Sequence, residues 1–457
     1  MERRDFNRRL LSSAVGAAVY GSRLQDSFAA GGRAASYSIN PDRLRASLES
    51  LGRFGLNPQG GVTRVAWTQA DAEARRFVME KLMPAAGLKG RVDAAGSIFG
   101  RREGREKLPV ILFGSHIDTV PEGGIFDGAL GSLAAIEVLH TLAERRIETR
   151  HPLECVIWSN EEGTHYGRGL FGSRAVLGEF EPGELEEKDE QGVLIRDAVA
   201  SIGGDLDRIR EAVRKPGEIA AYLELHIEQG GVLDAAGISI GVVEGIVGIV
   251  RYQATVTGQA NHAGTTPMPD RRDALVAAAQ LVTAVREETM REPGRQVGTV
   301  GKLSVHPDVP NIIPGRVDLV IELRDLSMAT LEGVYRRIEA RARQIERASG
   351  TRITMVPTSS HQPALCAPRV RDLIAREAQA AGLKTFSLPS GAGHDAQMIA
   401  RIAPMGMLFV PSAGGISHSP KELTRWEDAA AGCEVLYRTV LALDLLNENE
   451  DSRRVIC

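Results

Sequence analysis

Five short segments of the chain place histidine or acidic residues beside small residues. They are GSHIDTV (114–120), FDGALG (126–131), NEEG (160–163), LELHIEQGG (223–231) and GGISHSPKE (414–422). A borderline metal ion such as Zn²⁺ or Mn²⁺ prefers this mixture of imidazole and carboxylate ligands. The adjacent carboxylates of Glu161 and Glu162 suit two tasks, one as a ligand and one as a base. Together the segments predict one hydrolytic site with two metal ions.

The five segments carry this prediction only in combination. A single histidine after a strand is more often a hydrogen-bonded loop residue than a ligand, and a Glu-Glu pair usually lies at the surface. Their joint occurrence at compatible places in the chain is much harder to obtain by chance, and it favours a metal site.

The residue types also indicate how the work is divided. Two dications close together repel each other and need a shared carboxylate, which Asp127 can supply. Successive side chains diverge, so Glu161 is free to act as the general base if its neighbour is a ligand. Asp118 follows His116 by two residues and is expected to accept a hydrogen bond from the imidazole N–H that faces away from the metal.

The composition argues against several other classes of protein. The chain has 457 residues, enough for two domains, and its 43% hydrophobic and 25% charged residues are typical of a globular protein. A net charge of −4 gives no basic field for nucleic acid. No stretch approaches the roughly 20 apolar residues that span a membrane. The four cysteines form no CxxC pair, which argues against a thiolate metal site and a disulfide framework.

Four short apolar runs read as buried strands, and each is followed by a candidate group. Residues 109–113 precede His116 and Asp118, 153–158 precede Glu161 and Glu162, 219–225 precede His226, and 407–410 precede His418. Open α/β sheets place their sites at such carboxyl ends. Asp127 instead opens an expected helix at 128–142, where a carboxylate is favourable.

The pattern changes from about residue 246. Strands are expected at 249–259, 297–305, 316–324 and 351–356, and helices at 271–291 and 331–348. The order β-α-β-β-α-β predicts a ferredoxin-like unit. Patterns that suit the first domain resume after Pro357, so the second domain is expected to be inserted into the first.

The first 36 residues differ from the rest. The pair Arg3-Arg4 and Phe6 precede a modest apolar run at 10–20, and Ser-Phe-Ala at 27–29 offers a cleavage site. This order resembles a twin-arginine export signal and predicts a periplasmic or exported protein. The alternative is a basic tail that stays attached to a cytoplasmic protein.

These segments resemble those of the M20 metallopeptidase family. The closer likeness is to its branch of N-carbamoyl-L-amino-acid hydrolases, β-ureidopropionases and allantoate amidohydrolases, and it covers nearly the whole chain after about residue 40. In the peptidases of the family the position of His226 is usually Asp. A histidine there, within LELHIEQG, points to the branch that cleaves ureido groups.

The resemblance implies a fold and a division of the chain. The fold class is α/β, with a mixed-sheet, two-zinc aminopeptidase-like catalytic domain at 37–245 and 357–457. An inserted ferredoxin-like α+β domain at 246–356 would serve as lid and as the interface of a homodimer.

The resemblance also implies the roles of the candidate ligands. Asp127 would bridge two ions, of which Zn²⁺ is the first expectation and Mn²⁺ or Co²⁺ the alternatives, and Glu161 would be the base. The remaining ligands would be His116 and His226 at one ion, and Glu162 and His418 at the other.

Substrate contacts follow from the same resemblance. His262 and Asn311 would stabilise the oxyanion, Arg324 would pair with the substrate α-carboxylate, Gln229 would bind the ureido group, and Gly393 and His394 would line the pocket. In the family the imidazole that matches His262 reaches the partner's metals. Without the resemblance, His262 reads as a turn histidine, Asn311 as an Asx-turn, and Arg324 as half of a surface ion pair.

The expected reaction is hydrolysis of the carbamoyl C–N bond of an N-carbamoyl-L-amino acid to the amino acid, ammonia and carbon dioxide. Allantoate amidohydrolase and β-ureidopropionase activities are the alternatives. An aminoacylase or dipeptidase fits His226 and Gln229 less well, and a non-catalytic metal-binding protein would not need Glu161.

Overall fold

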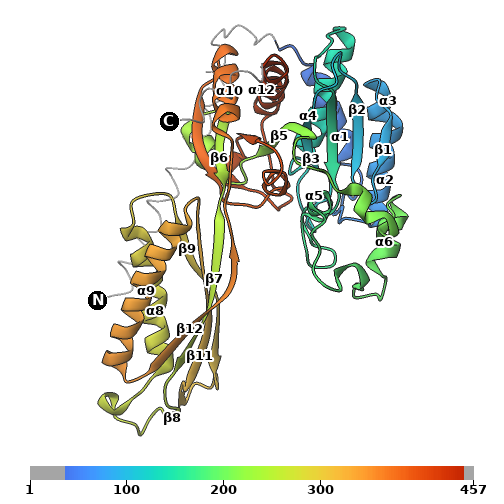
Figure 1. Cartoon of the computed structure of the whole chain (residues 1–457). Helices are drawn as coiled ribbons and strands as arrows, with labels where there is room; N and C mark the ends of the chain where they lie inside the picture. Colours follow the sequence, from blue (N-terminus) through green and yellow to red (C-terminus); the bar gives the residue numbers. More distant parts are fainter. Residues whose placement is uncertain (1–36, 447–457) are drawn as a thin grey trace, which may run out of the picture. The chain divides into compact units, whose positions relative to one another are not determined.

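The computed structural model describes residues 37–446, so the expected export signal lies outside the described residues. Within them, nine strands form one mixed sheet in the order β1-β2-β4-β3-β5-β15-β6-β13, with β14 paired to β6 (Figure 1). The strands are β1 (Gly90–Val92), β2 (Ile98–Arg102), β3 (Val110–His116), β4 (Leu153–Trp158), β5 (Ile219–Ile227), β6 (Ile240–Ile246), β13 (Ala364–Leu365), β14 (Thr385–Ser390) and β15 (Met405–Val410).

The four strands β4, β3, β5 and β15 are neighbours and run parallel. Every residue of β3, β4 and β15 is buried, as their uninterrupted apolar character predicts for strands covered on both faces. All four therefore end at the same edge of the sheet, where the sequence predicts the site.

Helices pack against this sheet. Helix α4 (Ala129–Glu144) contacts β3, β4 and β5, while α10 (Pro368–Ala380) and α12 (Trp426–Asp444) contact each other and β15. The other helices of this part are α1 (Pro41–Leu51), α2 (Gln69–Phe77), α3 (Met83–Ala85), α5 (Phe171–Leu177), α6 (Ile195–Ser201), α7 (Val232–Ala236) and α11 (Ala396–Ile399). Because α4 is buried on nearly all sides, it sets the position of Asp127 just before its first turn.

A second sheet is formed by the chain between β6 and β13. Its order is β12-β7-β11-β9, all antiparallel. The elements are β7 (Gly248–Thr257), α8 (Ala274–Arg291), β9 (Val297–His306), β11 (Arg316–Asp325), α9 (Met328–Ser349) and β12 (Arg352–His361). Alternate residues of β7 and β11 meet apolar residues of both helices in a separate hydrophobic core. The expected β-α-β-β-α-β order is found.

A short ladder extends this second unit. Strand β8 (Asn261–His262) pairs antiparallel with β10 (Ile312–Ile313). The sequence analysis did not predict these two strands, because two-residue runs are too short to show a periodicity.

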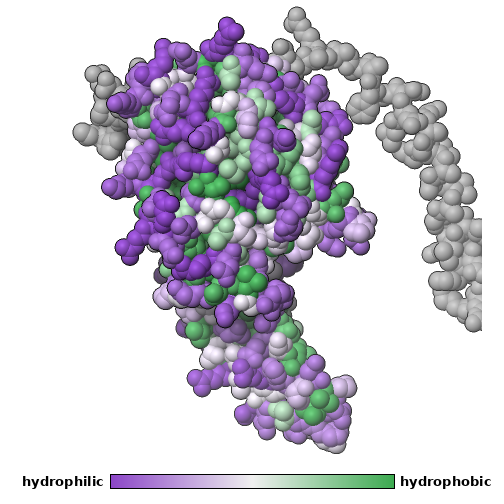
Figure 2. Space-filling model, turned by 90° about the vertical axis from the view of Figure 1, so that its right-hand side faces the viewer, coloured by the Kyte–Doolittle hydropathy of each residue, from purple (hydrophilic) through white to green (hydrophobic). Residues whose placement is uncertain are grey.

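Hydrophilic side chains cover most of the face of the protein that Figure 2 shows. Among residues 37–446, no helix is long and apolar enough to cross a membrane.

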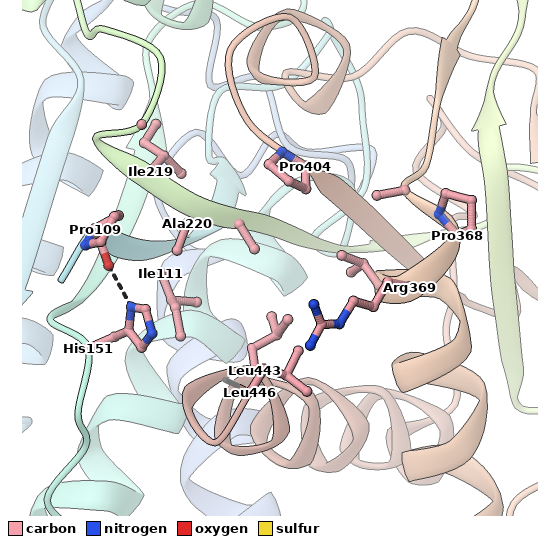
Figure 3. A pocket seen from close by; sticks show the side chains of 14 residues that line it. Pro109, Ile111, His151, Ile219, Ala220, Pro368, Arg369, Pro404, Leu443 and Leu446 are labelled. Atoms are coloured by element: carbon pink, nitrogen blue, oxygen red, sulfur yellow. Dashed lines mark hydrogen bonds between the residues drawn. The ribbon is translucent and has the colours of Figure 1, made fainter. Parts of the chain in front are cut away.

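A cavity of about 400 Å³ lies at the amino ends of the parallel strands, opposite to the expected site. Ile111 of β3, Ile219 of β5 and Leu443 of α12 give it an apolar wall (Figure 3). His151 also lines it, and its Nδ1 donates a hydrogen bond of 2.7 Å to the Pro109 carbonyl O. Within the described residues, no group of potential metal ligands lies there, so this cavity is not the metal site.

Candidate metal centre

The expected metal ligands come together at the carboxyl edge of the parallel strands. A cavity of about 230 Å³ is lined by all five, namely His116, Asp127, Glu162, His226 and His418, together with the expected base Glu161. The strands run slightly further than predicted: β3 ends at His116 itself, and His226 is the penultimate residue of β5. Both imidazoles are therefore held by the sheet ladder and only 1% exposed, a more rigid placement than a loop would give.

The two oxygens of Asp127 face two different sets of ligands. Oδ1 lies 3.5 Å from His116 Nε2 and 3.3 Å from His226 Nε2. Oδ2 lies 3.5 Å from His418 Nε2, which is in turn 3.4 Å from Glu162 Oε1. In each of the two sets, one ligand atom per residue falls within 4.8 Å of the others. This is the geometry that a carboxylate shared between two ions requires.

The hydrogen bonds of His116 and His226 use Nδ1 of each ring and leave Nε2 for a metal ion. His116 Nδ1 lies 3.0 Å from the Asp118 backbone O, and His226 Nδ1 lies 2.9 Å from the Ile227 backbone O. Since a carbonyl can only accept, both Nδ1 atoms carry a proton, and both Nε2 atoms, which face Asp127, are the ring nitrogens left for a metal ion. The sequence analysis expected the carboxylate of Asp118 to do this for His116, but that Oδ1 is 3.8 Å from the ring.

Asp118 has a different task. Its Oδ1 accepts a hydrogen bond of 3.3 Å from Glu161 N–H, and its Oδ2 accepts one of 3.2 Å from Glu162 N–H. The side chain is 3% exposed, and burial raises its pKa to about 6, although these two N–H groups oppose the shift. The carboxylate therefore fixes the turn that presents the two glutamates.

Several carboxylates lie close together in this cluster, and burial together with their mutual repulsion shifts their pKa values. Burial and the neighbouring Glu162 hold the pKa of Glu161 well above its ordinary value. Burial and Asp127 raise the pKa of Glu162 to about 8. The hydrogen bond to Asp127 raises the pKa of His418 to about 9. The raised pKa values of the two glutamates reflect burial and repulsion between neighbouring carboxylates, and bound cations would relieve this repulsion.

Two further observations test whether these residues fit metal ions. Glu162 Oε1 is buried and has no hydrogen-bond partner, an arrangement that is costly unless a cation or water takes it. Gly128 has φ +63°, and a Cβ there would lie 2.3 Å from the His116 ring. Only glycine lets the Asp127 backbone approach the imidazole this closely. The donor set, the unpartnered oxygen and the close approach all fit a two-metal centre.

The loop at 391–395 supplies another wall of the cavity. Gly393 and His394 line it, as expected from the sequence, and His394 is fully enclosed against the ring of His226 at a centroid distance of 4.5 Å. Ser390 Oγ lies 2.9 Å from His394 Nε2 and orients this imidazole. Leu170, which no motif indicated, is the largest apolar side chain in the cavity wall.

Gln229 lies in the cavity but contacts a ligand. Its Nε2 donates a hydrogen bond of 2.7 Å to Asp127 Oδ2, while its Oε1 has no partner. The residue has φ 58°, a left-handed conformation that is uncommon outside glycine and often found at functional sites. The Oε1 atom is buried, and no described residue donates to it.

His262 and Asn311 come together, but away from the cavity. The β8–β10 ladder pairs His262 with Ile312, and Ala263 N–H donates to the Asn311 carbonyl O at 3.0 Å. His262 Nδ1 accepts hydrogen bonds from Gly264 N–H and Thr265 N–H, which leaves the ring proton on Nε2. Neither His262 nor Asn311 lines the metal cavity of its own chain.

Arg324 is near the pocket loop without lining the cavity. Its Nε donates to Glu322 Oε1 at 2.7 Å, so Arg324 does form the kind of ion pair that the sequence analysis gave as the alternative. Its Nη1 donates to the Gly391 carbonyl O at 2.6 Å, two residues before Gly393. The guanidinium is therefore already oriented by two acceptors beside the cavity loop.

Comparison with known proteins places the chain in a family. The model of the peptidase family M20/M25/M40 matches residues 112–442. The chain belongs to this family. The match spans all the candidate ligands from His116 to His418.

Relatives with named activities are similar over most of the chain. An N-carbamoyl-L-amino acid amidohydrolase of Geobacillus stearothermophilus is 44% identical over 406 residues, which cover 89% of this chain and 99% of the relative. An allantoate amidohydrolase of Bacillus subtilis is 37% identical over 391 residues, covering 85% and 94%.

Two solved structures have a similar fold. An amidase of the hydantoinase/carbamoylase family from Burkholderia multivorans is 36% identical and superposes with a TM-score of 0.81, covering 89% of this chain and 98% of that one. A tripeptidase from Staphylococcus aureus is 15% identical with a TM-score of 0.63, a likeness of fold alone.

Proposed function

We propose that this M20 family member is a metal-dependent amidohydrolase that cleaves the carbamoyl C–N bond of N-carbamoyl-L-amino acids. The observation that carries the proposal is Asp127, whose two oxygens face the two ligand sets within one cavity. The 44% identical carbamoyl amino acid amidohydrolase supports the substrate class. One water is consumed for each substrate, and the products are the amino acid, ammonia and carbon dioxide.

The residues of the chain divide the reaction between them. His116 and His226 would hold one dication, Glu162 and His418 the other, and Asp127 both. The two ions, Zn²⁺ by first choice, supply a Lewis acid that polarises the ureido carbonyl and lowers the pKa of water.

Glu161 is placed to move the proton. Its Oε2 lies 3.7 Å from His116 Nε2, at the wall of the cavity that the expected ligands line, where a carboxylate can accept a proton. It would take a proton from the attacking water and pass it to the leaving nitrogen.

Recognition of the substrate falls to groups around the cavity. Arg324 would grip the α-carboxylate with its planar fork, which matches a carboxylate better than lysine does. The unpartnered Oε1 of Gln229 would accept from the ureido N–H groups. Gly393 and His394 would close the pocket on the substrate side.

The remaining oxyanion donors are proposed to come from a second copy of the chain. His262 and Asn311 do not line the cavity of their own chain, yet the bond pattern of His262 prepares its Nε2–H as a donor. We therefore propose a homodimer through the sheet of β7, β9, β11 and β12, in which the partner's His262 completes each site.

Activity measurements test the reaction. Exhaustive chelation should abolish turnover, and elemental analysis should find up to two metals per chain. A panel of N-carbamoyl amino acids, allantoate, N-acyl amino acids and dipeptides decides the substrate. Full activity in verified metal-free protein would end the proposal, and preference for allantoate would move the chain to the activity of its Bacillus subtilis relative.

Complementation tests the dimer. The variants Glu161→Gln and His262→Ala should each be inactive alone. After they are mixed and allowed to exchange subunits, one site of each heterodimer combines an intact Glu161 with the partner's His262, so part of the activity should return. Monomers at all concentrations, or no recovery after proven exchange, would contradict the dimer.

A further inference from the structure

Glu422 holds the backbone that carries Asp127. Its Oε1 accepts hydrogen bonds of 3.0 Å from both Phe126 N–H and Asp127 N–H. The residue is 7% exposed and lies 295 positions away from Asp127 in the chain. These two N–H groups precede α4 and have no other recorded acceptor, so the carboxylate satisfies donors that would otherwise be buried and unpaired.

The other oxygen of Glu422 reaches the loop of a second ligand. Oε2 lies 3.1 Å from Ser417 Oγ, and the same hydroxyl lies 2.9 Å from Asp127 Oδ2. Ser417 directly precedes His418, whose φ of 52° is left-handed. One side chain thus joins the backbone of Asp127 to the loop of His418, the two residues whose Oδ2 and Nε2 face each other at 3.5 Å.

The surrounding chain makes room for this carboxylate. A Cβ added to Gly124 would lie 2.2 Å from Glu422 Oε1 and 2.4 Å from its Cβ. Any side chain at Gly124 would therefore displace the carboxylate, and the glycine is required for the close approach.

We propose that Glu422 is a positioning residue of the metal centre, which sets the separation of Asp127 and His418 before any ion binds. The inference rests on the proposed role of Asp127 as a ligand. Groups that orient metal ligands in this way typically change metal affinity by about 10–100-fold when removed. Glu422 itself need not touch metal or substrate.

Two substitutions separate the hydrogen bonds from the charge. Glu422→Leu removes both acceptors at similar size, and we expect the dissociation constant for Zn²⁺ to rise by about 10–100-fold. Glu422→Gln keeps a carbonyl O for the two N–H groups, and its amide can donate to Ser417 Oγ, so near-normal affinity should return. Competition with a chromophoric chelator measures both, with Mn²⁺ as a second probe ion.

Asp444 offers a matched control. This buried carboxylate also accepts two backbone hydrogen bonds, from Arg150 N–H at 3.0 Å and His151 N–H at 2.8 Å, but at the opposite end of the strands. Asp444→Leu should lower the Tm of the metal-free protein as Glu422→Leu does, while leaving the affinity for Zn²⁺ unchanged. An equal loss of affinity in both variants would reduce Glu422 to a general stabilising residue and overturn the proposal.

Further variants keep the outcome decisive. If Glu422→Leu does not fold, Ser417→Ala removes the link from Glu422 to the second loop, together with the hydrogen bond of the same hydroxyl to Asp127 Oδ2, and should still weaken Zn²⁺ binding severalfold. Asp127→Ala distinguishes this inference from the proposed site. Unchanged Zn²⁺ affinity in Asp127→Ala would contradict the proposed metal site. If Asp127→Ala loses affinity while Glu422→Leu and Ser417→Ala keep normal affinity, only the positioning role of Glu422 is contradicted.

Discussion

The carboxylate Oδ2 of Asp118 accepts a hydrogen bond of 3.2 Å from the backbone N–H of Glu162. Its Oδ1 does the same for Glu161 at 3.3 Å. Asp118, the second residue after β3, thereby fixes the backbone of the turn after the neighbouring parallel strand β4. The Asp118 carboxylate thus binds the backbone of both the expected base, Glu161, and the expected ligand, Glu162.

Asp118→Asn should disturb this turn. The amide NH₂ would face one of the two backbone N–H groups, so one hydrogen bond becomes a repulsive contact of two donors. We expect kcat to fall by about 10–100-fold, with a smaller loss of bound metal. Steady-state kinetics and metal analysis on the same sample measure both. A wild-type kcat in Asp118→Asn would show that the two backbone hydrogen bonds to Asp118 are not needed for activity.

Glu161→Gln should separate chemistry from metal binding. The amide keeps the size of the side chain but cannot take a proton, while Glu162 is untouched. We predict that kcat falls by roughly 10²–10⁴, the range for loss of a general base, with metal content nearly intact. Should metal disappear in proportion to activity, the roles of Glu161 and Glu162 are exchanged.

Arg324→Lys should identify the substrate carboxylate. Lysine keeps the charge but cannot bond Glu322, Gly391 and a carboxylate with one planar fork. We expect KM for a carbamoyl amino acid to rise by about tenfold or more, the loss of one charge-assisted hydrogen bond of about 1.5–3 kcal/mol.

Two controls accompany this variant. Arg316→Lys lies eight residues away on the same strand, pairs with Asp318, and should leave KM unchanged. A substrate amidated at the α-carboxyl should be poor with the wild type and insensitive to Arg324→Lys. Equal wild-type turnover of the acid and the amide would refute the assignment.

The sequence predicted the parts of this site that depend on strand and helix patterning. The runs predicted as strands at 109–113 and 153–158 overlap the buried strands β3 and β4, and the positions of His116 and Glu161 near the ends of these strands followed from the patterning. Glu422 lies in the segment 414–422, but the sequence analysis gave it no role, because its partners Phe126 and Asp127 are nearly 300 residues away. Nothing local signals such a contact.

Side-chain direction was the other limit. The distance of two residues between His116 and Asp118 suggested a contact between the carboxylate and the ring, but β3 ends at His116, and the Asp118 backbone O contacts the ring instead. Likewise, the left-handed backbone of Gln229 turns its amide toward Asp127, which a pattern in sequence cannot show.

The stability of the metal-free protein should fall as pH rises. The pKa of Glu162 is raised from 4.5 to about 8, so its contribution is present below pH 4.5 and is lost as pH passes 8. The pKa values of His226 and His418 are raised from 6.5 to about 9, so their contributions are present below pH 6.5 and are lost toward pH 9. All three act in the same direction.

Thermal melts at several pH values test this prediction. The Tm of chelated protein should decrease between about pH 6.5 and 9, whereas Zn²⁺-loaded protein should show a much flatter profile, since bound cations replace the missing protons. Glu162→Gln should reduce the slope in the metal-free state. A Tm that rises over this window would contradict the charge balance assigned to the cluster.

The last prediction concerns the first 36 residues, which we propose to be a removable export signal. Ser38 N–H donates to Glu434 Oε2 at 2.7 Å, and Asn40 N–H donates to Glu137 Oε1 at 2.8 Å. A chain starting at Ser36 keeps both contacts and should fold, bind metal and retain activity. A chain starting at Pro41 removes these backbone donors from two buried glutamates and should melt lower.

Export itself is tested in the cell of origin. Changing Arg3 and Arg4 to lysine should leave the activity of the purified enzyme unchanged and keep the protein inside the cell, because the twin-arginine route reads that pair as an address. N-terminal sequencing of the native protein should show that roughly the first thirty residues are gone. An intact Met1 on the mature enzyme would mean a retained tail. If the double lysine variant were instead inactive after purification, the segment would have to contribute to the fold, and the proposal of a removable signal would be wrong.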